Sequence, residues 1–252
     1  MGRELIKIIE LDASPDQVWE AVATGPGISA WFVPHDLQPW LGGTIRARFG
    51  GGVDATGRVT AWEPGARFAH GSAEAPPEGV ADYAFEFLVE GRAGGGTVLR
   101  FVQSGFRDEG WEDEYSSFDA GWDLFFGNLR SYLTRFADHP ARTVVTMAIA
   151  PGSAAELWPV LRRALGVTGP PALGATVTLR PDGPPPVTGV VDVSSPEFLG
   201  LRSATGLHRI GAEGNAGCGI SAYHYFYGDP VDTDSLTAAW QSWLESLVPA
   251  PA

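Results

Sequence analysis

An internal repeat constrains the fold of this chain more than any other feature. The segment LGGTIRARF from Leu41 is similar to LGATVTLRP from Leu173, and TGRVTAWEPG from Thr56 is similar to TGVVDVSSPE from Thr188. Both pairs are 132 residues apart, so two separate segments keep the same register. Self-similarity at a fixed spacing indicates that one structural unit occurs twice.

The beginnings and ends of the two halves are also similar. Near the N-terminus, ELIKIIELDASPDQVWEAV contains Trp19, and RTVVTMAIAPGSAAELWPVL contains Trp158 at the corresponding position. Each half closes with a helical pattern, in which Trp122 of DAGWDLFFGNLRSYL aligns with Trp240 of TDSLTAAWQSWLESL. Each copy is therefore expected to run from a strand and a short helix to a closing helix.

The boundary between the copies falls near Pro140. A proline removes a backbone donor and disfavours helix at the residue before it, so the first closing helix must end by this point. Chance similarity is the alternative to a true repeat, but the order of elements matches throughout both halves. We therefore predict two domains, 1–138 and 139–252, the second being a shorter and more divergent copy.

The pattern within the first half predicts an antiparallel sheet followed by one long helix. The segments TIRARF, GRVTAWE, DYAFEFLVE and GTVLRFVQS alternate at period two and are separated by glycine-rich turns, as half-buried antiparallel strands are. Farther along, large apolar residues recur at alternating steps of four and three, which is the period of one helix face. These residues are Trp111, Tyr115, Phe118, Trp122, Phe125, Leu129, Tyr132 and Phe136. The predicted fold class is therefore α+β.

Several of these segments resemble one known superfamily. The segments SPDQVWEAVATGPGISAWFVP, LGGTIRARF, GRVTAWEPGARF and GWDLFFGNLRSYL resemble the START and birch-allergen helix-grip superfamily. Within it, the first half is similar to the branch named for activators of a heat-shock chaperone ATPase, over about 130 residues. The resemblance implies two tandem helix-grip domains, each a curved antiparallel sheet wrapped around a long C-terminal helix. It also implies an internal cavity that holds a hydrophobic small molecule.

The second half resembles this superfamily only through the repeat. It lacks the segment GISAWFVP and has RRALGVTGPPALG in its place. As a fused pair, the chain resembles di-domain proteins of actinomycete aromatic-polyketide and enediyne gene clusters. This narrower resemblance implies that the ligand is a polyketide, a polyene or a lipid-like molecule.

Composition limits the partners and the compartment. The 44% of apolar residues can form real cores, whereas the net charge of −13 argues against a nucleic acid or an anionic membrane as partner. The N-terminal MGRELIKIIEL carries spaced charges and no long apolar run, so we expect no membrane insertion. Cys218 is the single cysteine, which excludes an intramolecular disulfide and favours a cytoplasmic location.

The walls of the implied cavity are expected to be apolar, with few polar anchors. Alternation places Leu99, Phe101 and Gln103 on one face of a predicted strand and Arg100 on the other, so Gln103 is the better anchor. Core packing explains any single aromatic residue, whereas the surplus of rings on both sheet and helix favours a ligand site. The candidate ligand-binding residues are Trp31, Phe32, Tyr83, Phe85, Phe87, Leu99, Phe101, Gln103, Phe118, Trp122, Phe125, Tyr223, His224, Tyr225 and Trp240.

The sequence carries no strong catalytic or metal-binding pattern. It contains no HExxH, GxSxG, P-loop or Rossmann fingerprint. Its five histidines are scattered without ligand spacing, so we expect neither a metal ion nor a cofactor. His70 and His224 lie on predicted strands and are the candidates for a general acid or base inside a cavity.

Three functions fit these observations. The first is binding of a hydrophobic small molecule in an internal cavity, used in biosynthesis, sequestration or self-resistance, and it is favoured because no reaction motif is present. The second is an enzyme of the polyketide cyclase or aromatase kind, in which one acid–base residue promotes ring closure. The third is a module that interacts with a chaperone ATPase, which leaves an unidentified protein partner open.

Overall fold

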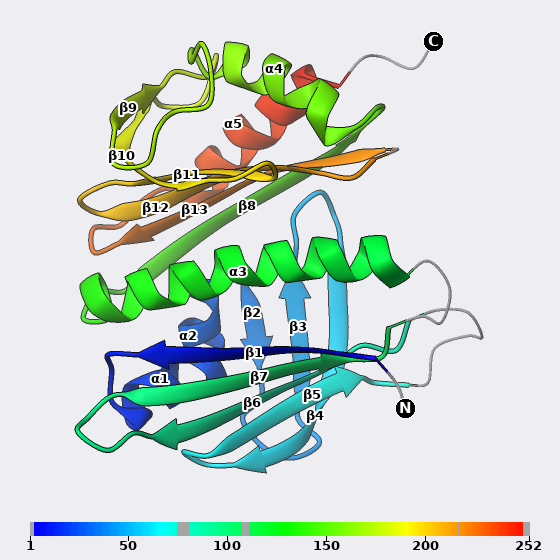
Figure 1. Cartoon of the computed structure of the whole chain (residues 1–252), viewed down its shortest axis with the longest axis vertical. Coiled ribbons are helices and arrows are strands. Elements are labelled where there is room, and N and C mark those ends of the chain that lie inside the picture. Colours follow the sequence, from blue (N-terminus) through cyan, green and yellow to red (C-terminus); the bar gives the residue numbers. More distant parts are fainter. Residues whose placement is uncertain (1–2, 75–80, 107–110, 216, 249–252) are drawn as a thin grey trace. The chain divides into compact units, whose positions relative to one another are not determined.

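The computed structural model describes residues 3–74, 81–106, 111–215 and 217–248. These residues group into two compact units (Figure 1). The first unit consists of Met1–Arg48 and Asp54–Asp138, and the second consists of Phe49–Val53 and His139–Ala252. No helix in the described ranges is long and apolar enough to cross a membrane.

The first unit is an antiparallel sheet with helices, in the strand order β1-β7-β6-β5-β4-β3-β2 (Figure 1). Its last six strands form a meander, and β1 returns to pair with β7. Helices α1 (Pro15–Ala23) and α2 (Gly25–Ser29) follow β1, and α3 (Trp111–Arg135) follows β7. The strands are β1 (Glu4–Leu11), β2 (His35–Leu37), β3 (Thr44–Arg48), β4 (Asp54–Glu63), β5 (Arg67–Ser72), β6 (Ala84–Gly91) and β7 (Thr97–Ser104).

The second unit has the same architecture with one strand fewer, in the order β8-β13-β12-β11-β10-β9. Helix α4 (Ala154–Ala164) follows β8, and α5 (Thr233–Ser246) follows β13. The strands are β8 (Ala141–Ala150), β9 (Thr176–Leu179), β10 (Val187–Ser194), β11 (Phe198–Arg202), β12 (Gly206–Glu213) and β13 (Cys218–Tyr227). Two antiparallel sheets with helices confirm the predicted α+β class.

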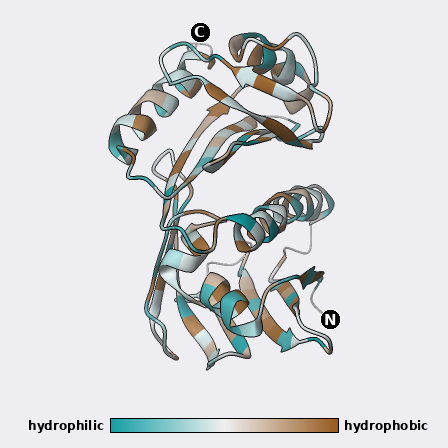
Figure 2. Ribbon diagram, turned by 90° about the vertical axis from the view of Figure 1, so that its left-hand side faces the viewer, coloured by the Kyte–Doolittle hydropathy of each residue, from teal (hydrophilic) through white to brown (hydrophobic). Residues whose placement is uncertain are grey.

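Hydrophilic and hydrophobic residues are interspersed along the strands (Figure 2), and more buried positions alternate with more exposed ones along β1 and β3. In β3 the buried positions Ile45 and Ala47 alternate with exposed Thr44 and Arg46. Strand β12 differs, because all of its positions from Gly206 onward are buried until its last residue. The second sheet therefore has buried residues on both of its faces along this strand.

The repeat extends to individual backbone hydrogen bonds. The N–H of Gly42 donates to the carbonyl of Val59, and the N–H of Gly174 donates to the carbonyl of Val191, both at 2.9 Å. Both glycines have positive φ angles, of 81° and 82°, which a residue with a side chain adopts only with strain. These equivalent turns are 132 residues apart, which is the offset read from the sequence.

Each unit also contains a bulge at the same repeated position. The register of β4 against β5 shifts between Val59 and Ala61, and that of β10 against β11 shifts between Val191 and Val193. A bulge inserts one residue and changes the face on which the following residues lie. In the second unit the inserted residue is Asp192.

In each unit a polar side-chain contact joins the closing helix to the first strand. In the first unit the ammonium group of Lys7 contacts the carboxylates of Asp119 and Asp123 at 2.7 and 2.6 Å. In the second unit the amide of Gln241 binds both the N–H and the carbonyl of Met147, at 3.4 and 3.1 Å. Asp123 and Gln241 each come one residue after the aligned tryptophan of their helix.

The first helix of each unit begins with the same capping box. Ser14 and Gln17 exchange side-chain and backbone hydrogen bonds before α1, and Ser153 and Glu156 do so before α4. Each box satisfies two backbone donors that the helix itself leaves without partners.

Removing the capping hydroxyl should therefore destabilise each unit by a similar amount. We expect Ser14→Ala and Ser153→Ala each to lower the free energy of unfolding by about 1 kcal/mol, measured by denaturant unfolding. Ser116→Ala is the matched control, because this exposed serine lies inside α3, where its hydroxyl bonds only to the carbonyl of Glu112. A control variant as destabilised as the cap variants would contradict this account.

Candidate functional site

The strand register of the first unit brings the predicted aromatic residues onto one face of the sheet. Gln103 of β7 lies directly opposite Phe85 of β6, and Phe101 lies opposite Phe87. On the next strand, His70 lies opposite Phe85. Directly paired residues of antiparallel strands project to the same side, so these five side chains share one face.

Trp122 of α3 covers this face and fixes the orientation of Gln103. Its ring centroid lies 4.2 Å from that of Phe101, and its Nε1 donates to Oε1 of Gln103 at 2.6 Å. An indole N–H is only a donor, so the amide atom that faces it must be the oxygen. The Nε2 group of Gln103 then has no hydrogen-bond partner in the described ranges, although the residue is 0% exposed.

Four ring contacts connect the sheet, the helix and the segment after α2. The centroid distances are 5.0 Å from His70 to Phe85, 6.1 Å from Phe85 to Trp122, 5.0 Å from Trp122 to Phe32, and 5.5 Å from Phe32 to His35. The two histidines at the ends of this series are close enough to interact electrostatically. We call these five residues the ring series.

Both histidines of the ring series are neutral at pH 7. Burial lowers the pKa of His35 to about 4, and its Nδ1 lies 2.7 Å from the carbonyl of Val33, so Nδ1 carries the proton. Burial and the neighbouring His35 lower the pKa of His70 to about 3. His70 nevertheless keeps part of its surface accessible, and within the described part of the chain its ring nitrogens make no hydrogen bond.

The remaining predicted residues of the first unit pack around the ring series. Trp31 donates from Nε1 to the carbonyl of Ala21 at 2.9 Å and stacks on Phe126, so it joins α1 to α3. Tyr83 and Phe118 contact each other at 5.0 Å, and the hydroxyl of Tyr83 bonds to Glu114. Phe125 contacts Phe32, whereas Phe87, Leu99 and Phe101 are almost fully buried.

The second unit places His224 where the first unit places Gln103. His224 lies directly opposite His208 in the β12–β13 pair, as Gln103 lies opposite Phe85. The ring of Trp240, which aligns with Trp122, lies 4.2 Å from that of His224. Each closing helix therefore presses its aligned tryptophan against a buried polar side chain of the preceding strand.

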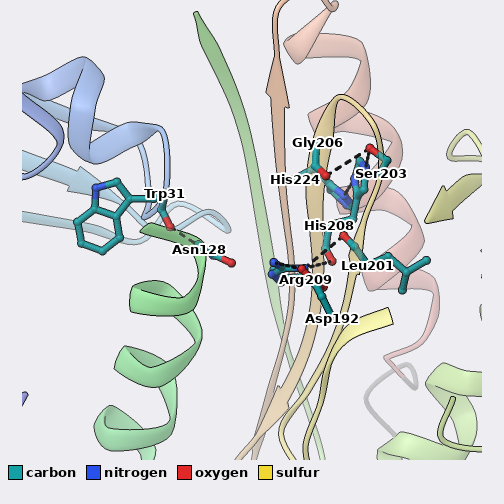
Figure 3. Close-up of polar contacts among 9 residues, drawn as sticks. All are labelled: Trp31, Asn128, Asp192, Leu201, Ser203, Gly206, His208, Arg209 and His224. Atoms are coloured by element: carbon teal, nitrogen blue, oxygen red, sulfur yellow. Dashed lines mark hydrogen bonds and ion pairs between the residues drawn. The ribbon is translucent and has the colours of Figure 1, made fainter. Parts of the chain in front are cut away.

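His224 belongs to a short hydrogen-bonded chain (Figure 3). Its Nδ1 lies 3.0 Å from Nδ1 of His208, and Nε2 of His208 lies 3.3 Å from the hydroxyl of Ser203. Burial lowers the pKa of His208 to about 4 and that of His224 well below its ordinary value, so both rings are neutral.

Tyr223 and Tyr225 do not lie with His224. Successive residues of a strand point to opposite faces, so the two tyrosines project away from the face that Trp240 covers. Both are buried, and burial raises the pKa of Tyr223 to about 12. They therefore do not share a site with His224 and Trp240, with which they were grouped from the sequence.

The sequence reading did not identify the buried ion pair between Arg209 and Asp192 (Figure 3). Arg209 is 1% exposed, and its guanidinium binds both carboxylate oxygens of Asp192, at 2.8 and 3.0 Å. It also donates to the carbonyl of Leu201 at 3.2 Å. The available signal was an arginine in the middle of the predicted apolar strand LHRIGAE. Its partner could not be found, because the bulge sets the direction of Asp192.

Metal ligation has no support in the described ranges. They contain no group of three or more His, Cys, Asp or Glu side chains arranged to hold a metal ion.

Breaking the buried ion pair should be costly. Asp192→Leu leaves the guanidinium of Arg209 buried without a carboxylate, so we expect the free energy of unfolding to fall by on the order of 3 kcal/mol in denaturant unfolding. The double variant Asp192→Leu/Arg209→Met should recover most of this loss, because it removes the unpaired charge. A double variant as unstable as the single one would show that another contact is responsible.

Acidification should destabilise the protein between about pH 6.5 and pH 4. The pKa of His35 and of His208 is about 4 in the folded protein and near 6.5 in an unfolded chain. The unfolded state therefore binds more protons in this window, so the free energy of unfolding falls as the pH falls. The loss is on the order of 3 kcal/mol for each histidine by pH 4.

Denaturant unfolding at a series of pH values measures this loss. Replacing the exposed His139 by Gln should leave the profile unchanged, whereas His208→Gln should make it shallower. A stability that is constant from pH 7 to pH 5 would contradict the assignment of neutral buried histidines.

Three comparisons with known proteins bear on this fold. Residues 12–134 match the family model described as "Activator of Hsp90 ATPase homolog 1-like protein". A search of curated proteins found no significant match.

Among solved structures, the protein MLL2253 from Mesorhizobium loti is 25% identical and covers 53% of this chain and 98% of its own, with a TM-score of 0.48. DynU16, a putative protein in the dynemicin biosynthetic locus, is 18% identical and covers 97% of this chain and 95% of its own, with a TM-score of 0.46. The di-domain ARO/CYC BexL from the BE-7585A biosynthetic pathway is 16% identical and covers 97% and 94%, with a TM-score of 0.48. The predicted resemblance is confirmed where the family model matches: residues 12–134 carry the pattern of the Activator of Hsp90 ATPase homolog 1-like family.

Proposed function

We propose that the first unit binds a flat, largely hydrophobic small molecule between its sheet and α3, with Gln103 as the polar anchor. The observation that carries this proposal is the Nε2 group of Gln103, which is buried without an acceptor. A buried N–H without a partner costs about 1–3 kcal/mol. A carbonyl oxygen on a bound molecule would supply the missing acceptor and remove this cost.

The surroundings of Gln103 favour a ligand with flat rings. Phe85, Trp122 and Phe32 are neighbours in the ring series, and aromatic faces prefer offset or edge contacts with other rings. Phe32, Phe85 and His70 each keep part of their surface accessible, whereas Phe87 and Phe101 beneath them are almost fully buried. This contrast supports a ligand position beside the ring series. A polyketide, a polyene with a carbonyl group, or a related molecule has the required chemistry.

The state of the histidines favours binding over proton-transfer catalysis. A general base works best when its pKa lies near the working pH. The pKa of His70 is lowered to about 3 by burial, so at pH 7 its ring is neutral but a weak base. We therefore assign His70 a role in ligand contact. On this proposal the protein sequesters or carries its ligand in the cytoplasm.

Two naphthalene compounds of similar size test the role of Gln103 in the full-length protein. 2-Acetylnaphthalene carries a carbonyl oxygen, and 2-ethylnaphthalene does not. We expect calorimetry or tryptophan quenching to show binding of both compounds. Gln103→Leu should weaken only 2-acetylnaphthalene, by about fivefold, because one hydrogen bond contributes about 1 kcal/mol.

Ser116→Ala is the control, since this exposed serine lies on α3 and its hydroxyl bonds to the carbonyl of Glu112. It should leave the binding of 2-acetylnaphthalene unchanged. The proposal fails if neither compound binds, or if Gln103→Leu leaves the preference for the carbonyl compound intact.

A further inference from the structure

The His208–His224 pair of the second unit has one arrangement of protons that satisfies all its contacts. The hydroxyl of Ser203 donates to the carbonyl of Gly206 at 3.3 Å, so its oxygen accepts from Nε2–H of His208. Nδ1 of His208 then has no proton and accepts from Nδ1–H of His224. In the reverse arrangement the Ser203 hydroxyl would donate its single proton to Nε2 of His208. Its hydrogen bond to the carbonyl of Gly206 would then be lost.

This direction leaves Nε2 of His224 as a bare acceptor. The residue is 1% exposed, and Nε2 has no hydrogen-bond partner among the described residues. The ring of Trp240 lies across the ring of His224, with an interplanar angle of 35°. A ring nitrogen accepts a hydrogen bond in the plane of its ring. Trp240 covers the face of the His224 ring, so it does not occupy the direction in which Nε2 accepts.

A second buried polar atom lies on the same face. Thr146 of β8 is opposite Ala222 of β13, and Val144 is opposite His224, so Thr146 and His224 are diagonal neighbours on one side of the sheet. Diagonal positions are about 7 Å apart, within reach of one small functional group. Thr146 is 0% exposed, and its hydroxyl also has no partner in the part of the chain that the structure describes.

Nε2 of His224 and the hydroxyl of Thr146 together offer one hydrogen-bond acceptor and one hydrogen-bond donor. Nε2 of His224 can only accept, whereas the hydroxyl of Thr146 can donate. A ligand hydroxyl can satisfy both, because its proton goes to His224 and its oxygen accepts from Thr146. An ether oxygen lacks the proton and can satisfy only Thr146. Trp240 and the neighbouring Phe226, 6.3 Å from His224, supply apolar contact for the rest of the molecule.

We propose that the second unit has its own binding site, formed by His224 and Thr146, for a flat molecule that carries a phenol or enol hydroxyl. This site goes beyond the function proposed for the first unit, since it lies in a different unit and selects a different chemical group. At the same position of the repeated fold, the first unit offers an N–H donor from Gln103 and the second offers an acceptor from His224.

The full-length protein tests this site with 2-naphthol and its methyl ether, 2-methoxynaphthalene, in calorimetric titrations. We expect 2-naphthol to bind about tenfold more tightly than the ether, because only 2-naphthol can donate to His224. Thr146→Val preserves the shape of the side chain and should weaken both compounds about tenfold, because the oxygen of each accepts from Thr146. His224→Phe should remove the preference.

Ser116→Ala is the control, because this exposed serine belongs to neither site, and it should leave the preference for 2-naphthol unchanged. A preference that disappears in Gln103→Leu would place the hydroxyl in the first unit and overturn the proposal. Equal affinities for the two compounds, or affinities that Thr146→Val leaves unchanged, would also overturn it. The acetyl and hydroxyl probes differ, so failure of one site is distinguishable from failure of the other.

A measurement on the unsubstituted protein covers the case in which the variants do not fold. In histidine-selective nitrogen NMR, the Nε2 resonance of His224 should lie in the range of an unprotonated nitrogen and shift when 2-naphthol is added. A protonated Nε2, or a resonance that 2-naphthol does not move, would refute the assignment.

Discussion

Both units depend on the contact between one tryptophan of the closing helix and one buried polar side chain of the preceding strand. Trp122 holds Gln103 through a hydrogen bond, and Trp240 lies against the ring of His224. The strand and the helix are consecutive in the chain, so this contact joins the end of the sheet to the element that covers it. In the first unit the ring of Trp122 then packs on that of Phe101, whereas in the second unit Trp240 and Trp243 belong to a largely aliphatic core.

The fold was largely predictable because its elements carry their own periodicities. The alternation that placed Leu99, Phe101 and Gln103 on one face is visible in five consecutive residues, and in the structure Trp122 donates a hydrogen bond to Gln103. The repeat offset was predictable for the same reason, since Gly42 and Gly174 occupy turns that require a positive φ angle. Strand alternation and turn conformation depend on local backbone geometry, which residues close together in the sequence determine.

The candidate site was less predictable, because it depends on the register between strands. Nothing in the sequence shows that His70 lies opposite Phe85, or that His208 lies opposite His224. His224 and Tyr225 of β13 were both candidate ligand-binding residues, but a ligand site needs side chains on one face, and Tyr225 lies on the other. The bulge at Asp192 interrupts alternation in β10, so the partner of Arg209 could not be inferred from spacing.

The two units show that one fold can present opposite hydrogen-bonding groups at one position. The first unit retains α2 and Phe32, which contacts Trp122 and closes the aromatic surroundings of an amide donor. The second unit has no helix that corresponds to α2 in its described residues, and its closing helix has 14 residues instead of 25. Opposite His224 it has a second histidine, His208, whose Nδ1 lies 3.0 Å from Nδ1 of His224. On the proposed proton arrangement His208 accepts the Nδ1 proton of His224, which leaves Nε2 of His224 as an acceptor. Divergence of the copies thus changed the polarity of the anchor while the tryptophan above it was kept.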